Sequence, residues 1–286
     1  MSEVALQRPG VSVWWMAARP RTLAASIAPV VVGTALAGAA RPLAAALCLL
    51  SSLFIQIGTN LANDYSDFKR GADAERVGPR RVTQSGLVHP LLVKRAAILA
   101  FAVAAALGVA LALMSGWPIV AIGAASIAAG WLYTGGPWPL GYHGLGDLFV
   151  FVFFGLVATC GTAYALLLAV PLQAWLAGAA MGALATAILV VNNLRDRETD
   201  AKVAKNTLAV KLGPRWTRAE YAALLAVAFA LALPLGRPWP LLALPLALPP
   251  LRRVLRSDGA ALNPALGETA RLQLAFALLL ALELWP

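Results

Sequence analysis

Long apolar runs, separated by short polar segments, are the main feature of this sequence. Nine of these runs are largely uncharged and long enough to cross a hydrocarbon core of roughly 30 Å as helices. They lie at residues 22–40, 43–66, 95–114, 118–133, 147–168, 172–194, 219–236, 238–255 and 269–285. The pattern therefore predicts an all-α integral membrane protein with nine transmembrane helices, of which the eighth is the least regular because prolines interrupt it.

The composition favours one membrane domain. Of the 286 residues, 60% are hydrophobic and only 13% are charged, which is more apolar than a soluble globular protein requires. No linker, low-complexity block or change of composition divides the chain. We therefore expect a single transmembrane domain over residues 1–286.

Positive charge is distributed asymmetrically between the predicted loops. If the N-terminus is cytoplasmic, nine crossings place all of the 23 Lys and Arg residues on the cytoplasmic side except Arg41 and Arg237. Cytoplasmic loops of membrane proteins collect Lys and Arg in this way. The sequence thus predicts a cytoplasmic N-terminus, and topology explains the net charge of +10 without any binding to nucleic acid.

The second run ends in NLANDYSDFKRGAD, where carboxylates and amides follow an uncharged stretch. If the helix continues through this segment, polar residues at offsets of 0, 3, 4 and 7 share one helix face. They are Asn60, Asn63, Asp64 and Asp67. A helix from residue 43 to 67 is about 37 Å long, so its carboxylates are expected at the cytoplasmic boundary of the membrane.

The sixth run ends in a second acidic segment, VVNNLRDRETD. Asn192, Asp196 and Asp200 recur every four residues, which places them on one helix face with Asn193 beside them. Three crossings lie between the two acidic helices, so both helices point the same way. Both acidic ends are therefore expected on the cytoplasmic side.

This pairing indicates a diphosphate site. Carboxylate and amide oxygens are ligands that Mg²⁺ prefers, and Mg²⁺ usually binds one or two carboxylates together with phosphate oxygens. Neighbouring Lys and Arg residues suit the remaining phosphate charge. The alternative is that the carboxylates are solvated residues at the membrane surface, paired with nearby basic side chains.

Several strings in the sequence resemble one family. NDYSDFKRGAD resembles the first aspartate-rich motif of the UbiA superfamily of intramembrane prenyltransferases, and DRETD resembles the second. ARPRTLAASIAPVVVGTALA, YTGGPWPLGYHGLGDLFVFVFFG and NNLRDRETDAKVAKNTLAVKLG are similar to the 1,4-dihydroxy-2-naphthoate polyprenyltransferases of menaquinone biosynthesis. The resemblance covers nearly the whole chain and implies a UbiA-like helical bundle around a central cavity.

The resemblance also implies roles for individual residues. The implied catalytic residues are Asn60, Asn63, Asp64, Asp67, Asp73, Asp196 and Asp200. Two Mg²⁺ ions would be bound by Asp64, Asp67, Asp196 and Asp200. The implied substrate-binding residues are Arg19, Arg81, Tyr133, Tyr142, Asn192, Asn193 and Lys205. Ala204 stands where the family usually has glycine, a departure that concerns the shape of this loop and not the charge of the lysine after it.

The reaction implied is the transfer of a polyprenyl group from polyprenyl diphosphate to 1,4-dihydroxy-2-naphthoate, with loss of CO₂ and diphosphate. Mg²⁺ and basic side chains would stabilise the leaving diphosphate, and Tyr65, Tyr133 or Tyr142 would face the developing carbocation. The isoprenoid tail would lie in a lateral groove open to the lipid bilayer. The protein would lie in the inner (cytoplasmic) membrane, with its active site facing the cytoplasm.

Other functions stay open at this point. A UbiA-type enzyme could use 4-hydroxybenzoate, homogentisate, haem or a glycerol-phosphate lipid as its acceptor. A cation-coupled transporter would also carry paired acids, although transporters usually place them near the bilayer midplane.

The glycine-rich loop YTGGPWPLGYHGLGD lacks the preceding strand of a nucleotide-binding loop. We expect this loop to form a flexible lid over the site, anchored by Asp147.

Overall fold

The computed structural model describes residues 9–38, 40–75 and 77–286, and all regular structure in these residues is helical. The α-helices are α1 (Val11–Ala18), α2 (Pro20–Ala35), α3 (Pro42–Lys69), α4 (Pro90–Ser115), α5 (Pro118–Leu132), α6 (Gly146–Phe151), α7 (Ala158–Leu167), α8 (Leu172–Lys202), α9 (Leu208–Ala232), α10 (Leu244–Arg256) and α11 (Asn263–Leu284). Shorter helical segments are η1 (Leu140–His143), η2 (Val152–Val157), η3 (Leu233–Leu235), η4 (Trp239–Ala243) and η5 (Gly259–Leu262).

Proline marks the start of several helices. The first residues of α2, α3, α4 and α5 are prolines. A proline at this position fixes a helical φ angle and lacks only an N–H group that has no partner within the helix. The sequence therefore sets the start of these helices locally.

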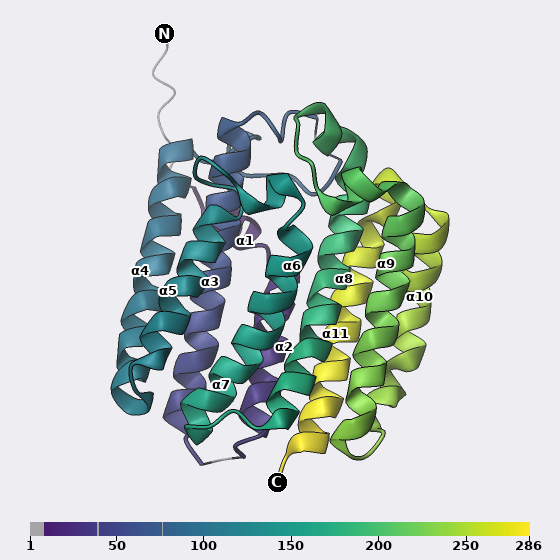
Figure 1. Cartoon of the computed structure of the whole chain (residues 1–286). Coiled ribbons are helices and arrows are strands. Elements are labelled where there is room, and N and C mark those ends of the chain that lie inside the picture. The colour runs from purple at the N-terminus through teal and green to yellow at the C-terminus, as the bar shows by residue number, and fades with distance from the viewer. Residues whose placement is uncertain (1–8, 39, 76) are drawn as a thin grey trace.

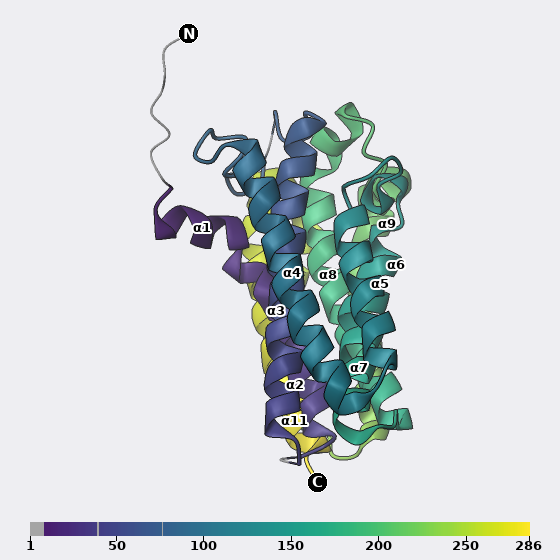
Figure 2. The same ribbon diagram turned by 90° about the vertical axis from the view of Figure 1, so that its left-hand side faces the viewer.

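The long helices run side by side in one elongated bundle (Figure 1). α3 and α8 end at the same end of the bundle, where the loops after α3, α5 and α8 gather, and the C-terminus lies at the opposite end. α1 lies crosswise to the bundle axis near the loop end (Figure 2). The two acidic segments are thus brought to one end of the protein.

The prediction of an all-helical membrane protein is confirmed. Six helical segments in the described part of the chain are long and apolar enough to cross a membrane, and α5 is apolar but shorter. Each of the nine predicted runs overlaps a helix, and the run at 147–168 is built from α6, η2 and α7. The chain is therefore a multi-pass membrane protein, while the number of nine crossings stays a prediction.

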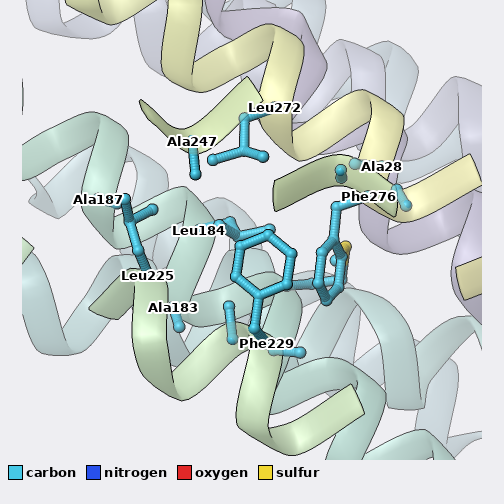
Figure 3. Close-up of a cluster of buried hydrophobic side chains, with 14 of the residues drawn as sticks. Ala28, Ala183, Leu184, Ala187, Leu225, Phe229, Ala247, Leu272 and Phe276 are labelled. Atoms are coloured by element: carbon cyan, nitrogen blue, oxygen red, sulfur yellow. The ribbon is translucent and has the colours of Figure 1, made fainter. Parts of the chain in front are cut away.

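The packing around α8 depends on glycine. A Cβ added to Gly182 would lie 2.6 Å from the carbonyl oxygen of Phe151, and one added to Gly155 would lie 2.4 Å from the Cα of Gly182. Small residues allow such close approach of helix backbones in membranes. On another side of α8, Phe229 and Phe276 pack edge to face, with ring centroids 5.1 Å apart, beside Leu184 and Leu272 (Figure 3).

Candidate active site

A cavity of about 970 Å³ lies among α2, α3, α4, α5, α6, η2, α7 and α8 and reaches the loop end of the bundle. Its polar residues include Arg19, Asn60, Asn63, Asp67, Arg81 and Lys205. Much of the remaining wall is apolar, and Ile122, Phe149, Phe153 and Val157 contribute to it. A cavity with one charged part and an extended apolar wall suits an amphipathic ligand with an anionic head.

Asn60 holds the corner between α1 and α2. Its amide nitrogen donates to the carbonyl oxygen of Ala18 and to the hydroxyl of Thr22, both at 2.9 Å, and its oxygen accepts from Gln56 at 3.3 Å. Arg19 at this corner has a φ of +53°, a left-handed conformation that costs a non-glycine residue about 1–2 kcal/mol. Asn60 thus supports the strained backbone that places Arg19 in the cavity wall.

Asn63 and Asp64, which follow on the same helix, have different partners. Asn63 lines the cavity and accepts a 2.7 Å hydrogen bond from the Thr134 hydroxyl at the end of α5. Asp64 is buried outside the cavity lining, and its two oxygens accept hydrogen bonds from the backbone N–H groups of Val82 (3.2 Å) and Thr83 (3.3 Å). Asp64 therefore holds the loop after α3 and positions the residue before Val82, which is Arg81.

Asp67 is the carboxylate of α3 that faces the cavity. It accepts hydrogen bonds from Arg81 Nη2 at 3.0 Å and from the hydroxyl of Tyr142 at 2.9 Å. The guanidinium of Arg81 also reaches Asp73, with 3.5 Å between Nε and Oδ1. One buried arginine thus joins two of the three carboxylates of the first acidic segment.

The second acidic segment is paired in a similar way. Arg195 binds Asp196 through two nitrogens, at 2.7 and 2.6 Å, and the same guanidinium donates to Asn192 at 2.8 Å. Lys205 binds Asp200 at 3.2 Å. Asn192, Asn193, Arg195 and Lys205 line the cavity, whereas Asp196 and Asp200 are buried and do not belong to its lining.

Tyr142 links the glycine-rich loop to both acidic segments. Its hydroxyl binds Asp67, its carbonyl oxygen accepts from the backbone N–H of Asn206 at 3.0 Å, and Lys205 lies over its ring. Burial, and then the negative charge of Asp67, raise the pKa of Tyr142, so its hydroxyl stays protonated and donates. Tyr142 therefore anchors this loop, whereas the Oδ2 atom of Asp147, in the first turn of α6, is buried without a hydrogen-bond partner among the described residues, so an anchoring role for Asp147 stays a prediction. Tyr133 lines the cavity, with its hydroxyl against Gly146.

Electrostatics around Arg81 show that the two acidic segments meet. Burial by itself lowers the pKa of Arg81, but nearby negative charges outweigh this effect and raise its pKa. Those charges belong to Asp67, Asp73, Asp64 and, from α8, Asp196. Carboxylates from both helices therefore surround one guanidinium.

The donor chemistry of the site fits Mg²⁺. No group of three or more His, Cys, Asp or Glu side chains in the described ranges forms a ready-made metal cluster. Asp67 and Asp200 nevertheless offer hard carboxylate oxygens, and Asp200 Oδ2 is buried with no hydrogen-bond partner among the described residues. These carboxylates contact Arg81 and Lys205, so a metal ion has to compete with basic side chains for them.

Residues 26–261 match the profile of the UbiA prenyltransferase family. The chain belongs to this family. Its resemblance to UbiA enzymes, inferred from the two aspartate-rich motifs, is thereby confirmed.

Several curated members of the UbiA family are similar over nearly their whole length. The 1,4-dihydroxy-2-naphthoate octaprenyltransferase of Mycobacterium tuberculosis (strain ATCC 25618 / H37Rv) is 47% identical over 280 residues, which cover 94% of this chain and 95% of that protein. The protein of the same name from Escherichia coli (strain K12) is 38% identical and covers 95% and 94%. UbiA prenyltransferase domain-containing protein 1 of Homo sapiens is 31% identical, over 92% of this chain and 80% of that protein.

Solved structures of UbiA proteins share the fold. A UbiA homolog from Archaeoglobus fulgidus bound to GPP and Mg²⁺ has a TM-score of 0.65 and 17% identity, and the match covers 94% of this chain and 99% of that one. The apo structure of a UbiA homolog from Aeropyrum pernix K1 has a TM-score of 0.64 and 18% identity, with 92% and 96% covered. The UbiA-like helical bundle is therefore shown for this chain.

Four residues of this UbiA site have contacts that sequence reasoning missed: Thr22, Gln56, Thr134 and Arg195. Helix geometry does not predict the contact of Arg195 with Asp196, because consecutive residues on a helix do not face each other. The long Arg195 side chain nevertheless bends toward Asp196. Gln56 precedes Asn60 by four residues, so its place on the same helix face was available as a signal. Thr22 and Thr134 lie in other helical segments, and no local pattern predicts their contacts.

Proposed function

We propose that this chain transfers a polyprenyl group from polyprenyl diphosphate to 1,4-dihydroxy-2-naphthoate, with loss of diphosphate and CO₂, to give demethylmenaquinol. The observation that carries the proposal is one cavity that combines basic side chains and Asp67 with a long apolar wall. The names of the curated relatives, among them one that is 47% identical, support the naphthoate as acceptor. The prenyl diphosphates bound by related proteins of the same fold support the donor.

Departure of the diphosphate is the step that the polar part of the cavity would assist. As the allylic C–O bond lengthens, negative charge grows on the leaving oxygens. Arg19, Arg81 and Lys205 lie in the cavity wall, where their positive charges stabilise this transition state. Bound Mg²⁺ would neutralise further diphosphate charge.

The metal ligands that the geometry favours are Asp67 and Asp200. Asp67 faces the cavity, and Asp200 has a buried oxygen without a hydrogen-bond partner among the described residues. Asp64 and Asp196 would complete the expected pair of ion sites with the lone pairs that remain beside their present hydrogen bonds, which come from backbone N–H groups and from Arg195. Two Mg²⁺ ions on these four carboxylates remain our proposal.

The two tyrosines would have different roles. Tyr133 lines the cavity, so its ring is our candidate for the face that stabilises a carbocation-like carbon, a contact worth about 0.5–2 kcal/mol. Tyr142 binds Asp67 through its hydroxyl and lies outside the lining, so we assign it to holding the carboxylate. Asn60 and Asn63 would orient the polar end of the site through their contacts with neighbouring helices.

We also propose the topology that the charge pattern predicts. The chain would be one domain over residues 1–286, with nine crossings of the inner (cytoplasmic) membrane and with its N-terminus and active site on the cytoplasmic side. The loops that follow α3 and α8 lie at one end of the bundle (Figure 1) and carry many of the basic residues. This common location supports the proposed orientation.

The test is a product assay with the purified chain in lipid vesicles. Vesicles receive Mg²⁺, a polyprenyl diphosphate and one acceptor at a time: 1,4-dihydroxy-2-naphthoate, 4-hydroxybenzoate or homogentisate. We expect a prenylated product from the naphthoate only, with a mass that shows loss of CO₂, and none when EDTA replaces Mg²⁺. A product from another acceptor alone would contradict the proposed substrate, and cation-dependent solute uptake without any product would favour a transporter.

A further inference from the structure

Basic side chains of the chain itself already neutralise four carboxylates of the site. Arg81 contacts Asp67 and Asp73, Arg195 binds Asp196, and Lys205 binds Asp200. Buried charges require such partners because an isolated buried ion is costly. A divalent cation that enters this site therefore competes with a cation that is already present.

Arg81 differs from the other two because of where it is attached. Arg195 and Asp196 are consecutive residues of α8, and Lys205, in the loop after α8, binds a carboxylate only 5 residues before it. Arg81 instead binds Asp67 from 14 residues further along the chain, in the irregular loop after α3, and Asp64 holds the backbone beside it. Its side chain can therefore change partners without any movement of α3 or α8.

The guanidinium of Arg81 also has donor capacity left. The residue is only 7% exposed and lines the cavity. Its Nη1 atom is buried with no hydrogen-bond partner in the part of the chain that the structure describes. A planar guanidinium binds the oxygens of a phosphate group with two parallel hydrogen bonds, so a diphosphate in the cavity offers Arg81 a replacement for Asp67.

We propose that Arg81 is a stand-in cation, which holds Asp67 and Asp73 when no ligand is bound and moves to the diphosphate when a metal ion takes its place. Metal alone is repelled by the guanidinium, which stays beside Asp67 and Asp73 as long as no phosphate oxygen is offered to it. Diphosphate alone meets the negative charge of Asp67. The two ligands therefore bind cooperatively, and by thermodynamic linkage each raises the affinity for the other by the same factor.

Binding of Mn²⁺ to the full chain in detergent tests this inference, which rests on the proposed function only for the choice of ligand. Electron paramagnetic resonance of free Mn²⁺ gives the affinity with and without inorganic pyrophosphate, after correction for the Mn²⁺–pyrophosphate complex in buffer. For the unmodified chain we expect pyrophosphate to tighten Mn²⁺ binding at least about tenfold. For Arg81→Met we expect Mn²⁺ alone to bind at least about tenfold more tightly, with a coupling factor below about three.

Arg253→Met is the matched control. Arg253 forms two hydrogen bonds with Glu268, at 2.9 and 3.2 Å, outside the cavity lining, so the same change should leave Mn²⁺ binding as in the unmodified chain. Arg81→Lys covers the case in which Arg81→Met does not fold. A single ammonium cannot bridge Asp67 and Asp73 as the guanidinium does, so Mn²⁺ alone should bind this variant more tightly than the unmodified chain.

The inference is overturned if the folded Arg81 variants bind Mn²⁺ alone no more tightly than the unmodified chain, or if pyrophosphate has the same effect on all of them. No prenylated product is measured in these experiments. A chain that prenylates the naphthoate but shows no effect of Arg81 keeps the proposed function and loses this inference. A chain that shows the coupling but forms no product keeps this inference and loses the proposed function.

Discussion

At the scale of single residues, Asp67 connects the cavity to two loops. It lines the cavity, binds Arg81 and accepts a hydrogen bond from the Tyr142 hydroxyl. These contacts come from the loop after α3 and from the glycine-rich loop. The negative charge at position 67 is therefore expected to organise two loops as well as to bind ligand.

The Asp67→Asn substitution keeps the shape of this side chain and removes its charge. We expect the rate of prenyl transfer to fall at least about a hundredfold, a loss typical of removing one electrostatic contact to the transition state. Product formation at saturating substrates measures it, and circular dichroism checks the fold. His143→Ala is the control, because His143 stacks on Trp138 outside the cavity lining and its loss should keep most of the activity. More than a tenth of the activity in Asp67→Asn would contradict our assignment.

Ala204 provides a second prediction at this scale. Its φ is +56°, so it adopts the left-handed conformation that glycine accepts without cost. The loop therefore keeps a conformation typical of glycine although the residue is alanine. We expect Ala204→Gly to leave the free energy of unfolding unchanged or to raise it by up to about 1 kcal/mol, since relief of strain outweighs the extra entropy of the unfolded chain.

Thermal unfolding of the detergent-solubilised chain measures this effect. Ala204→Val is the counterpart, because a β-branched residue at positive φ is strained, and we expect a free energy of unfolding lower by about 2 kcal/mol. A Tm that falls with glycine and is unaffected by valine would show that position 204 is not strained.

At the scale of helices, the contact between α8 and the segment from α6 to η2 holds the site together. The first half of α8 is rich in Ala and Gly and packs closely on η2 through Gly155 and Gly182. The second half of the same helix carries the acidic segment. The packing that places α8 in the bundle therefore also places Asp196 and Asp200.

Gly182→Ala should disturb this helix contact. The added Cβ would lie 2.6 Å from the carbonyl oxygen of Phe151, so the backbones have to separate. We expect the free energy of unfolding to fall by about 1–3 kcal/mol, measured by thermal unfolding. Gly267→Ala makes the same change in α11, where the added Cβ would meet no other segment of the described chain within 4 Å, so it should stabilise the helix slightly. Equal effects of the two substitutions would contradict the close packing.

At the scale of the whole molecule, the two ends of the bundle differ. The loops after α3 and α8 and the site lie at one end, and the turn between α4 and α5 lies at the other (Figure 1). The only cysteines, Cys48 and Cys160, are buried. New cysteines at exposed positions can therefore report which end faces the cytoplasm.

Single cysteines placed at Glu198 and Trp117 test the proposed orientation. The Glu198 side chain is 82% exposed near the site, and Trp117 is 78% exposed at the opposite end. In intact cells a membrane-impermeant thiol reagent should label Trp117→Cys and not Glu198→Cys, because the site is proposed to face the cytoplasm. Inverted membrane vesicles should give the reverse pattern. Labelling of Glu198→Cys in intact cells would overturn the proposed topology.

Sequence alone was sufficient for the long apolar helices, though not for α1, and for the location of the two acidic segments. Apolar runs of membrane-spanning length form helices because unsatisfied backbone groups are costly in hydrocarbon. Both acidic segments continue their helices to Lys69 and Lys202, so the carboxylates emerge at the helix ends as the residue spacing predicted. The two aspartate-rich motifs and the long strings of residues around them were enough to predict membership of the UbiA family, which the family match confirms.

Tertiary structure decided what each polar side chain contacts. Four polar residues of α3 have four different partners. Asn60 binds the α1–α2 corner and Asn63 binds Thr134 after α5. Asp64 binds the loop after α3, and Asp67 binds Arg81. Helical periodicity describes only the direction of a side chain from its own axis. Its partner depends on which other segments pack there, and these lie far away in the sequence. The pairing of Arg81 with two carboxylates is therefore a property of the folded bundle and not of any local motif.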